Sequence, residues 1–281
     1  MIGTLLALTA GFVESFIDVF SKKLKSVDKL LLFGTGAAIP LIIAWVVVAF
    51  QGIPTVPYLF WVYVIILVPL ELLGAYLYLK AVQTEDLSLI APLINITPAI
   101  ILFASWLLAI EPMRVRGAAG ILLIVCGTIL LTTTAPRGTI HTLTTAGGAW
   151  TLIAATIWAA TSMLGKQAVL LGGVFFFLAC CFLIMMAVLG CIVATGFRAR
   201  IKTMRGKTSA TIVRGLVNAV AVVVQNTAYL FAPVGVVIAL KRTSTLWRLL
   251  WGRIVFKEQF GARRTVAAIV TFAGVLCILL P

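Results

Sequence analysis

Residues 173–196 read GVFFFLACCFLIMMAVLGCIVATG, twenty-four positions without a charged side chain. A helix of about 20 residues crosses the roughly 30 Å hydrocarbon core of a bilayer, so this stretch is long enough to span a membrane. It lacks the alternation of apolar and polar residues that strands of a membrane β-barrel require. Because lipid offers no hydrogen-bond partner to the backbone, the stretch predicts a transmembrane α-helix.

Comparable apolar runs, bounded by charged residues, Gly or Pro, fill the rest of the 281-residue chain. They predict spans at 2–21, 30–50, 58–79, 87–109, 115–134, 146–166, 173–196, 210–231, 234–256 and 263–280. The whole chain is 62% apolar and only 11% charged, with a mean hydropathy of +1.18. This composition excludes a soluble domain, which has about 25% charged residues. We therefore predict an all-α integral membrane protein with ten transmembrane helices, surrounded by the lipid bilayer.

The basic residues that produce the formal net charge of +14 are concentrated in the predicted loops on one side of the membrane. Fourteen of the 22 Lys and Arg residues fall in loops after the first, third, fifth, seventh and ninth spans, three fall on the other side, and five lie within spans. The positive-inside rule makes the fourteen-charge side cytoplasmic, so a multi-pass protein of the cell membrane with both termini outside is predicted. This distribution does not indicate a nucleic-acid partner. The five cysteines lie in apolar runs without CxxC spacing, so we expect no metal and no other cofactor.

Two parts of the chain match each other weakly. A shift of 147 positions aligns Ala81 with Ala228, Leu93 with Leu240, Arg116 with Arg263 and Gly127 with Gly274, and a shift of 144 aligns Lys22 with Lys166. Residues 1–140 and 141–281 would then be two five-helix repeats. Because five is odd, the second repeat enters the membrane in the opposite direction. Inverted repeats of this kind meet around a cavity near the bilayer midplane.

Three short motifs suggest a family. They are Ile157–Lys166 (IWAATSMLGK), Leu87–Pro92 (LSLIAP) followed by Thr97-Pro98, and Val234–Thr245 (VGVVIALKRTST). The chain resembles the EamA family of the drug/metabolite transporter superfamily over almost its whole length. The resemblance implies secondary transport through a cavity lined mainly by the first, third, fourth, sixth, eighth and ninth spans, often for export of small metabolites. This chain departs from the family in having Glu14 where the repeat shift matches Trp158, a position that is commonly aromatic.

Several charged residues lie inside predicted spans. Glu14 and Asp18 are one helical turn apart in the first span, and Glu71 is in the third. The ninth span contains Lys241, Arg242, Arg248 and Arg253. A charge at the centre of a membrane helix costs at least about 2.5–3.5 kcal/mol, so each of these groups needs a partner, water or a function.

A rise of about 1.5 Å per residue places these charges at two depths. Glu14, Glu71 and Arg248 fall roughly 18–21 Å below the outer face, together with Asn95 between Pro92 and Pro98, which each free a backbone carbonyl. Lys241 and Arg242 fall about 10 Å below it, near Gln225 and Asn226. The sequence thus predicts two polar layers.

These layers supply the candidate site. The predicted substrate-binding residues are Lys241, Arg242, Arg248, Ser244, Thr245, Asn95, Gln225, Asn226, Trp158 and Tyr78. The predicted proton-coupling residues are Glu14, Asp18 and Glu71, because burial raises the pKa of a carboxyl group. The alternative for Glu14, Glu71 and Arg248 is a permanent ion-pair latch between helices. The alternative for the aromatic residues is packing or contact with lipid, and Arg214 is expected to snorkel to the membrane interface.

Three functions compete at this stage. The first is a secondary transporter that alternates access and moves a small anionic or amphipathic metabolite, with proton coupling as an option. The second is a flippase for a phosphate-bearing lipid or a polyprenyl-phosphate head group. The third, an intramembrane enzyme, is disfavoured because the sequence has neither an acid pair with a His partner nor a GxxxxGK loop.

Overall fold

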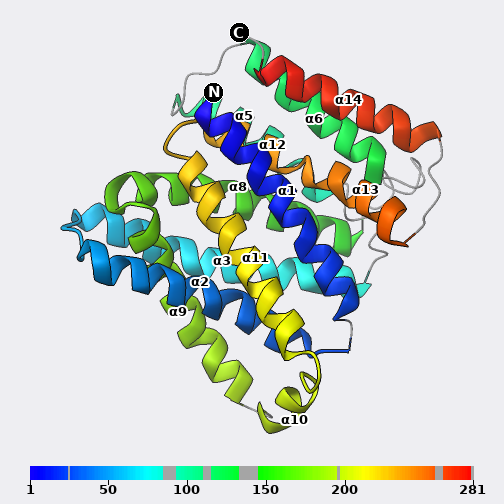
Figure 1. The fold of residues 1–281 in the computed structure, drawn as a ribbon. Helices are drawn as coiled ribbons and strands as arrows, with labels where there is room; N and C mark the ends of the chain where they lie inside the picture. The colour runs from blue at the N-terminus through cyan, green and yellow to red at the C-terminus, as the bar shows by residue number, and fades with distance from the viewer. Residues whose placement is uncertain are drawn as a thin grey trace.

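The computed structural model describes residues 1–24, 26–84, 93–109, 115–132, 145–194, 197–256 and 262–279. Its regular structure in these ranges is entirely α-helical (Figure 1). The first half contains α1 (Ile2–Lys23), α2 (Lys29–Gln51), α3 (Tyr58–Thr84), α5 (Thr97–Leu107) and α6 (Val115–Thr132). The second half contains α8 (Ala146–Gly172), α9 (Val174–Ala194), α10 (Phe197–Lys202), α11 (Thr208–Ala228), α12 (Val234–Lys241), α13 (Ser244–Phe256) and α14 (Ala262–Leu279).

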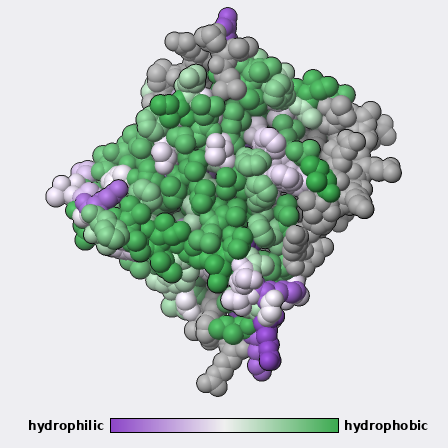
Figure 2. Space-filling model, viewed as in Figure 1, coloured by the Kyte–Doolittle hydropathy of each residue, from purple (hydrophilic) through white to green (hydrophobic). Residues whose placement is uncertain are grey.

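Six of the described helices are long and apolar enough to cross a bilayer: α1, α2, α3, α8, α9 and α11. Shorter apolar stretches occur at Thr97–Leu107, Val115–Leu130 and Val266–Ile278. Aliphatic side chains in the middle of helices are turned outward, including Ile42 and Ile65, each 61% exposed. Figure 2 shows a broad hydrophobic face with hydrophilic residues toward its outer corners. The chain is therefore a multi-pass membrane protein, whereas the count of ten spans stays a prediction.

Helices of the two halves pack in pairs that a two-fold operation would exchange. Helix α3 packs on α8 as α1 packs on α11, and α5 packs on α8 as α13 packs on α1. Helices α2 and α6 pack on α9 and α14, their own counterparts in the second half. This arrangement agrees with the predicted inverted repeat. The predicted boundary at 140/141 lies outside the described residues.

The contact between α6 and α14 follows the 147-residue shift residue by residue. A Cβ atom added to Gly120 would lie 2.8 Å from the Gly274 carbonyl oxygen, and one added to Gly127 would lie 3.0 Å from the Ala267 carbonyl oxygen. The shift exchanges these contacts, because 120 corresponds to 267 and 127 to 274. Because glycine has no side chain, these positions allow the two helices to approach closely, as is usual for helix pairs in membranes.

The predicted fourth and ninth spans are not continuous helices. Asn95-Ile96 forms a turn before α5, and Arg242-Thr243 forms a turn between α12 and α13. The two turns coincide under the 147-residue shift. Pro98 explains the first, since it cannot donate to the Ile94 carbonyl four residues earlier. The Thr97 hydroxyl donates to that carbonyl instead, at 2.7 Å.

The predicted end of the sixth span at Lys166 was wrong, because α8 continues to Gly172, and Gly173 with φ +74° ends it. The Lys166 ammonium donates to the Ala232 carbonyl oxygen at 2.9 Å, so it has a hydrogen-bond partner inside the helix bundle. The expected snorkelling of Arg214 stays a prediction; its guanidinium donates to Ser21 Oγ at 2.9 Å and to the Leu32 carbonyl oxygen at 3.0 Å. It therefore connects α11 with α1 and α2.

Two apolar cores flank the interior. One gathers residues of α12 with Ile101, Ile124 and Tyr229. The other lies between α2, α3, α8 and α9, where Phe60 stacks on Phe176 with ring centroids 5.3 Å apart. The space between these cores contains the candidate site.

Candidate functional site

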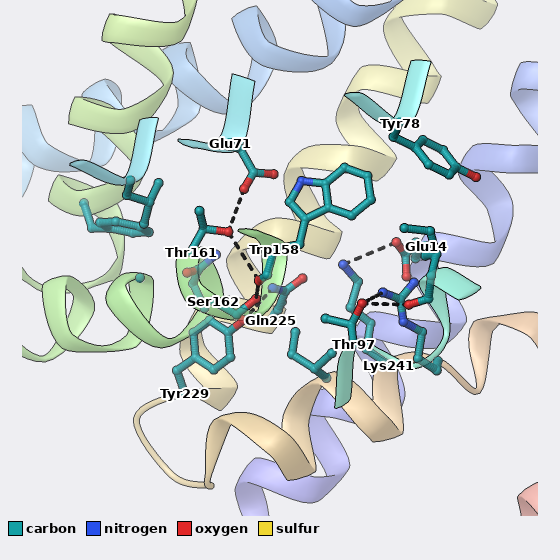
Figure 3. A pocket seen from close by; sticks show the side chains of 17 residues that line it. Glu14, Glu71, Tyr78, Thr97, Trp158, Thr161, Ser162, Gln225, Tyr229 and Lys241 are labelled. Carbon is teal, nitrogen blue, oxygen red and sulfur yellow. Dashed lines mark hydrogen bonds and ion pairs between the residues drawn. The ribbon is translucent and has the colours of Figure 1, made fainter. Parts of the chain in front are cut away.

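A cavity of about 470 Å³ lies between α1, α3, α5, α8, α11 and α12, and we call it the central cavity. Its volume falls within the range of about 300–1,000 Å³ that is usual for small-molecule sites. Two carboxylates and two cations line it, Glu14, Glu71, Lys241 and Arg242. Figure 3 shows these groups among aromatic and hydroxyl side chains. The two negative and two positive formal charges of these four side chains therefore cancel.

The two cations stand where α12 ends. The Arg242 amide donates to the Ile238 and Ala239 carbonyls, and the Thr243 amide donates to Leu240 before α13 begins at Ser244. The end of a helix exposes carbonyl groups with partial negative charge, which stabilises nearby cations. Helix α12 is otherwise buried and apolar from Val234 to Leu240. The break thus presents Lys241 and Arg242 to the cavity from a rigid support.

Glu14 reaches this helix end because α1 packs closely against it. A Cβ atom on Gly11, one turn before Glu14, would lie only 2.8 Å from the Lys241 carbonyl oxygen. Without a side chain there, Lys241 Nζ lies 3.3 Å from Glu14 Oε1 (Figure 3). Each side chain of this ion pair is about one quarter exposed, at 25% and 26%. The pair is therefore partly hydrated and can be separated.

Glu71 lies on a different wall, on α3. Its Oε2 accepts a hydrogen bond of 2.9 Å from the Thr161 hydroxyl on α8. Trp158, one turn earlier on α8, contacts Tyr78 of α3, with ring centroids 5.5 Å apart. The Trp158 indole nitrogen is buried and has no hydrogen-bond partner within the described part of the chain. The α3–α8 wall combines one carboxylate with a pair of aromatic rings.

Helix α11 supplies amide groups. Gln225 Nε2 donates to the Tyr229 hydroxyl at 2.8 Å, and Asn226 Nδ2 donates to the Val222 carbonyl at 2.8 Å. On the opposite side, Arg242 Nη2 lies 3.4 Å from Thr97 Oγ1. The neutral amide and hydroxyl groups among these can exchange hydrogen bonds with a polar guest at a small cost.

The structure brings together eight of the residues predicted from the sequence. The central cavity is lined by Glu14, Glu71, Tyr78, Trp158, Gln225, Asn226, Lys241 and Arg242. Asn95, Ser244 and Thr245 are not among its lining residues, because the turns at 95–96 and 242–243 interrupt the continuous helical face that the prediction assumed. Asn95 and Ser244 are buried. Asp18 and Arg248 lie on α1 and α13, but their side chains are outside the described part of the chain.

The predicted separation into two polar layers was wrong. Glu14 was placed about 10 Å deeper than Lys241 by assuming straight, upright helices with a rise of about 1.5 Å per residue. The two residues instead form an ion pair within one cavity. The helix break and the close packing of α1 on α12 remove the difference in depth. The tryptophans of α13 also contact α1, where Trp247 packs on Phe12 and Trp251 packs on Phe16.

Sequence reasoning missed several lining residues, notably Thr97, Thr161, Ser162 and Tyr229. Helical spacing could have found three of them. Thr161 and Ser162 follow Trp158 by three and four positions, and Tyr229 follows Gln225 by four, so each pair shares a helix face. Helical spacing could not have found Thr97, because this residue reaches the central cavity only through the turn at Asn95-Ile96.

Comparisons with known proteins agree with this description. The family model described as the EamA-like transporter family matches residues 1–133 and 145–280. A solved structure described as "Crystal structure of protein" is 16% identical, with a TM-score of 0.77 over 99% of this chain and 97% of that one. This likeness concerns the fold alone. No curated protein matches the chain. The family match covers almost the whole of both halves, and the chain therefore belongs to the EamA-like transporter family of the drug/metabolite transporter superfamily.

Proposed function

We propose that the protein is a secondary active transporter that carries a small anionic or amphipathic metabolite through the central cavity by alternating access. The observation that supports this most strongly is the presence of Lys241 and Arg242 at a helix break inside a cavity of about 470 Å³. A cationic side chain inside a membrane protein is costly to bury, and such groups usually mark a substrate or ion pathway.

In this proposal the two cations bind the anionic group of the substrate. Arg242 offers a planar fork of donors that suits a carboxylate or phosphate, and Lys241 offers a compact charge. An incoming anion competes with Glu14 for Lys241, whose ion pair spans 3.3 Å. Trp158 and Tyr78 contact the apolar part of the guest, as aromatic side chains commonly do in ligand sites.

Glu14 and Glu71 carry the coupling proton in this proposal. When the substrate's anion displaces Glu14 from Lys241, the released carboxylate is stabilised by taking up a proton. Glu71 holds a second carboxyl group on the α3–α8 wall, where Thr161 donates to it. Alternating access then requires the two related walls, α1–α11 and α3–α8, to move against each other, as in other inverted-repeat transporters.

The orientation inferred from the loop charges belongs to the same proposal. Fourteen basic residues on one side favour a cytoplasmic position for that side, with both termini outside. An affinity tag at either terminus should then be accessible to an impermeant antibody on intact cells. Detection of the tag only after permeabilisation would reverse the orientation.

The test begins with purified protein and a thermal-stability screen of phosphate monoesters, amino acids and their neutral analogues, since a bound ligand stabilises the folded state. Hits are then tested for counterflow in proteoliposomes. Lys241→Ala and Arg242→Ala should each reduce counterflow by about tenfold or more, because a charge-assisted hydrogen bond is worth about 1.5–3 kcal/mol. Lys202→Ala, at an exposed cation on α10, is the control and should leave transport unchanged. Wild-type counterflow in both cavity variants would refute the site.

The flippase is the second candidate. Its lipid chain would have to leave the central cavity between helices while the phosphate stays with Lys241 and Arg242. A second cavity beside the first, lined by α2 and α9, is the observation that favours it. Accumulation of a fluorescent lipid phosphate in one leaflet of proteoliposomes would support the flippase, whereas saturable movement of a water-soluble hit would support the metabolite transporter.

A further inference from the structure

A second cavity, of about 320 Å³, lies between α2, α3, α9 and α11, and we call it the side cavity. These four helices pack together beside the central site (Figure 1). Four residues line both cavities: Leu67, Glu71, Phe177 and Asn226. The side cavity therefore adjoins the central one, and Glu71 lies at the boundary between them.

The wall of the side cavity is mostly apolar. It is formed by Leu32, Phe33, Gly36, Ala37, Leu67, Phe177, Leu178, Cys181, Phe182, Met185 and Val222, with Glu71, Arg214, Asn218 and Asn226 as its polar members. Phenylalanine rings and the flexible Met185 side chain can adjust to an apolar guest. Gly36 has no side chain, which leaves space beside Arg214.

Three of the four polar members of the wall each direct at least one donor to another group of the protein. Arg214 donates to Ser21 and to the Leu32 carbonyl, and Asn218 Nδ2 donates to the Gly36 carbonyl at 2.8 Å. Asn226 Nδ2 donates to Val222 within its own helix. A buried water needs two to four polar partners, whereas an apolar cavity stays dry and binds apolar molecules. The wall chemistry thus favours hydrocarbon over a chain of waters.

One lining residue of the side cavity is also exposed on the outside of the helix bundle. Phe33 is 44% exposed and belongs to the span Leu30–Gln51. A flexible chain that extends from Glu71 toward Phe33 would pass a mostly apolar wall, whose other polar members are Arg214, Asn218 and Asn226. By contrast, the charged groups Lys241, Arg242 and Glu14 all line the central cavity and not the side cavity.

From these observations we propose that the side cavity binds the apolar tail of the substrate while its charged head occupies the central cavity. The substrate class is then a single-chain amphiphile with a small anionic head. This inference rests on the proposed function, since it assumes that the head is bound by Lys241 and Arg242. It adds a tail site and predicts that affinity depends on chain length.

The chain contains a reporter for this site together with a matched control. Cys181 lines the side cavity and is 7% exposed, whereas its neighbour Cys180 is 6% exposed and lines neither cavity. Variants that keep one of these cysteines, with the other four replaced by Ala, are treated with hexyl methanethiosulfonate in nanodiscs. The thiolate sulfur forms a disulfide with the hexylthio group, methanesulfinate leaves with the electron pair, and the thiol proton goes to solvent.

We expect Cys181 to react about tenfold faster than Cys180 or more, because Cys180 must wait for local opening of the helix packing. Equal rates would overturn the proposal. Equally fast reaction of Cys181 with the charged trimethylammonium-ethyl reagent would also overturn it, because the cavity would then be wet. If the single-cysteine variants do not fold, the unmodified chain is labelled and fragment mass spectrometry assigns the label to Cys180 or Cys181.

A second arm connects the tail to the head. Methyl, propyl and hexyl phosphate are tested for protection of Cys181. Each added methylene should lower the half-protecting concentration by about fourfold, from about 0.8 kcal/mol per buried methylene. Protection independent of chain length would contradict a tail site, and equal protection by 1-hexanol would contradict its connection to the head. Ala37→Phe, which fills the side cavity, should remove the advantage of hexyl over methyl phosphate.

These outcomes are separable from failure of the proposed function. Wild-type counterflow in Lys241→Ala and Arg242→Ala would remove the head site, whatever the labelling of Cys181 shows. Equal labelling of Cys180 and Cys181 would remove the tail site and leave a water-soluble substrate in the central cavity.

Discussion

The ion pair between Glu14 and Lys241 distinguishes a structural latch from a substrate site. At an effective dielectric constant of about 20, opposite charges separated by the Lys241 Nζ–Glu14 Oε1 distance of 3.3 Å attract each other by about 5 kcal/mol before desolvation is subtracted. Both side chains are about one quarter exposed. The cost of removing one partner should lie between the exposed and buried limits, at about 1–3 kcal/mol.

We therefore expect Lys241→Met and Glu14→Gln each to lower the free energy of unfolding by about 1–3 kcal/mol. The double variant should be more stable than the sum of the two losses predicts, by a coupling energy of about 1–2 kcal/mol, because neither charge is left without its partner. Equilibrium unfolding of the four proteins in mixed micelles measures this cycle.

Transport decides between the two roles. If Lys241 binds the substrate, the double variant recovers part of its stability and still shows no counterflow. If the pair is only a latch, the neutral double variant transports at a rate near that of the wild type. Wild-type counterflow in Lys241→Met with Glu14→Gln, or a coupling energy of zero, would refute our assignment of this pair.

Three further changes test other parts of the account. Gly11→Ala should destabilise the protein by about 1–3 kcal/mol and reduce counterflow, because the added Cβ would lie 2.8 Å from the Lys241 carbonyl oxygen. The control is Gly34→Ala, whose added Cβ would meet no other part of the described structure within 4 Å. Equal melting temperatures for the two variants would contradict the close packing of α1 on α12. At the membrane edge, burial of the Asp28 carboxyl acts to raise its pKa, but hydrogen bonds from Arg200, Leu31 and Leu30 and the Arg200 charge hold the pKa below its ordinary value of 3.8. The stability that this group contributes is thus present above that value and lost as the pH falls through its folded pKa. Wild type and Asp28→Asn should therefore differ in thermal unfolding at pH 7, and the difference should shrink as the pH is lowered through and below the folded pKa; a difference that does not change with pH would contradict the pairing. Trp158→Phe should weaken binding of an amphipathic ligand, because the smaller ring leaves less aromatic surface in the central cavity; unchanged binding would contradict contact between Trp158 and the ligand.

Much of this fold could be predicted from hydropathy and spacing. Long apolar runs predicted helices such as α2 and α9, because lipid excludes both charges and unpaired backbone groups. The 147-residue shift was weak in the sequence, yet Gly127 and Gly274 lie in equivalent contacts of α6 with α14. The repeat could be found because close helix packing requires small residues at corresponding positions.

The candidate site was only partly predictable. Charged residues inside predicted spans could be recognised as site candidates, because a charge in the membrane needs a partner, water or a function. Their depth in the membrane could not be obtained from the rise per residue of a straight helix. The turns at Asn95-Ile96 and Arg242-Thr243 shift the register of two spans, and Gly11 allows α1 to approach α12. These effects come from contacts between distant segments, to which the hydropathy of a single span is insensitive.

The side cavity was not predicted at all. Its wall consists of ordinary apolar residues, which look the same in a sequence whether they pack on each other or line an opening. Only the arrangement of α2, α3, α9 and α11 shows that Glu71 adjoins this space as well as the central cavity. The contact of Arg214 with α2 was missed for a related reason, because its carbonyl partner is more than 180 residues away in the chain.

The central claim is that the central cavity opens alternately to the two sides of the membrane. Ser162 lines this cavity, and Ser162→Cys in a chain whose five native cysteines are replaced by Ala introduces one thiol there. Labelling of this thiol in oriented proteoliposomes with a charged, impermeant methanethiosulfonate, added first from one side and then from the other, tests the claim without knowledge of the substrate. The account predicts labelling from either side, with a rate that shifts between sides when a pH gradient is imposed. Labelling from one side only, under every gradient, would contradict it.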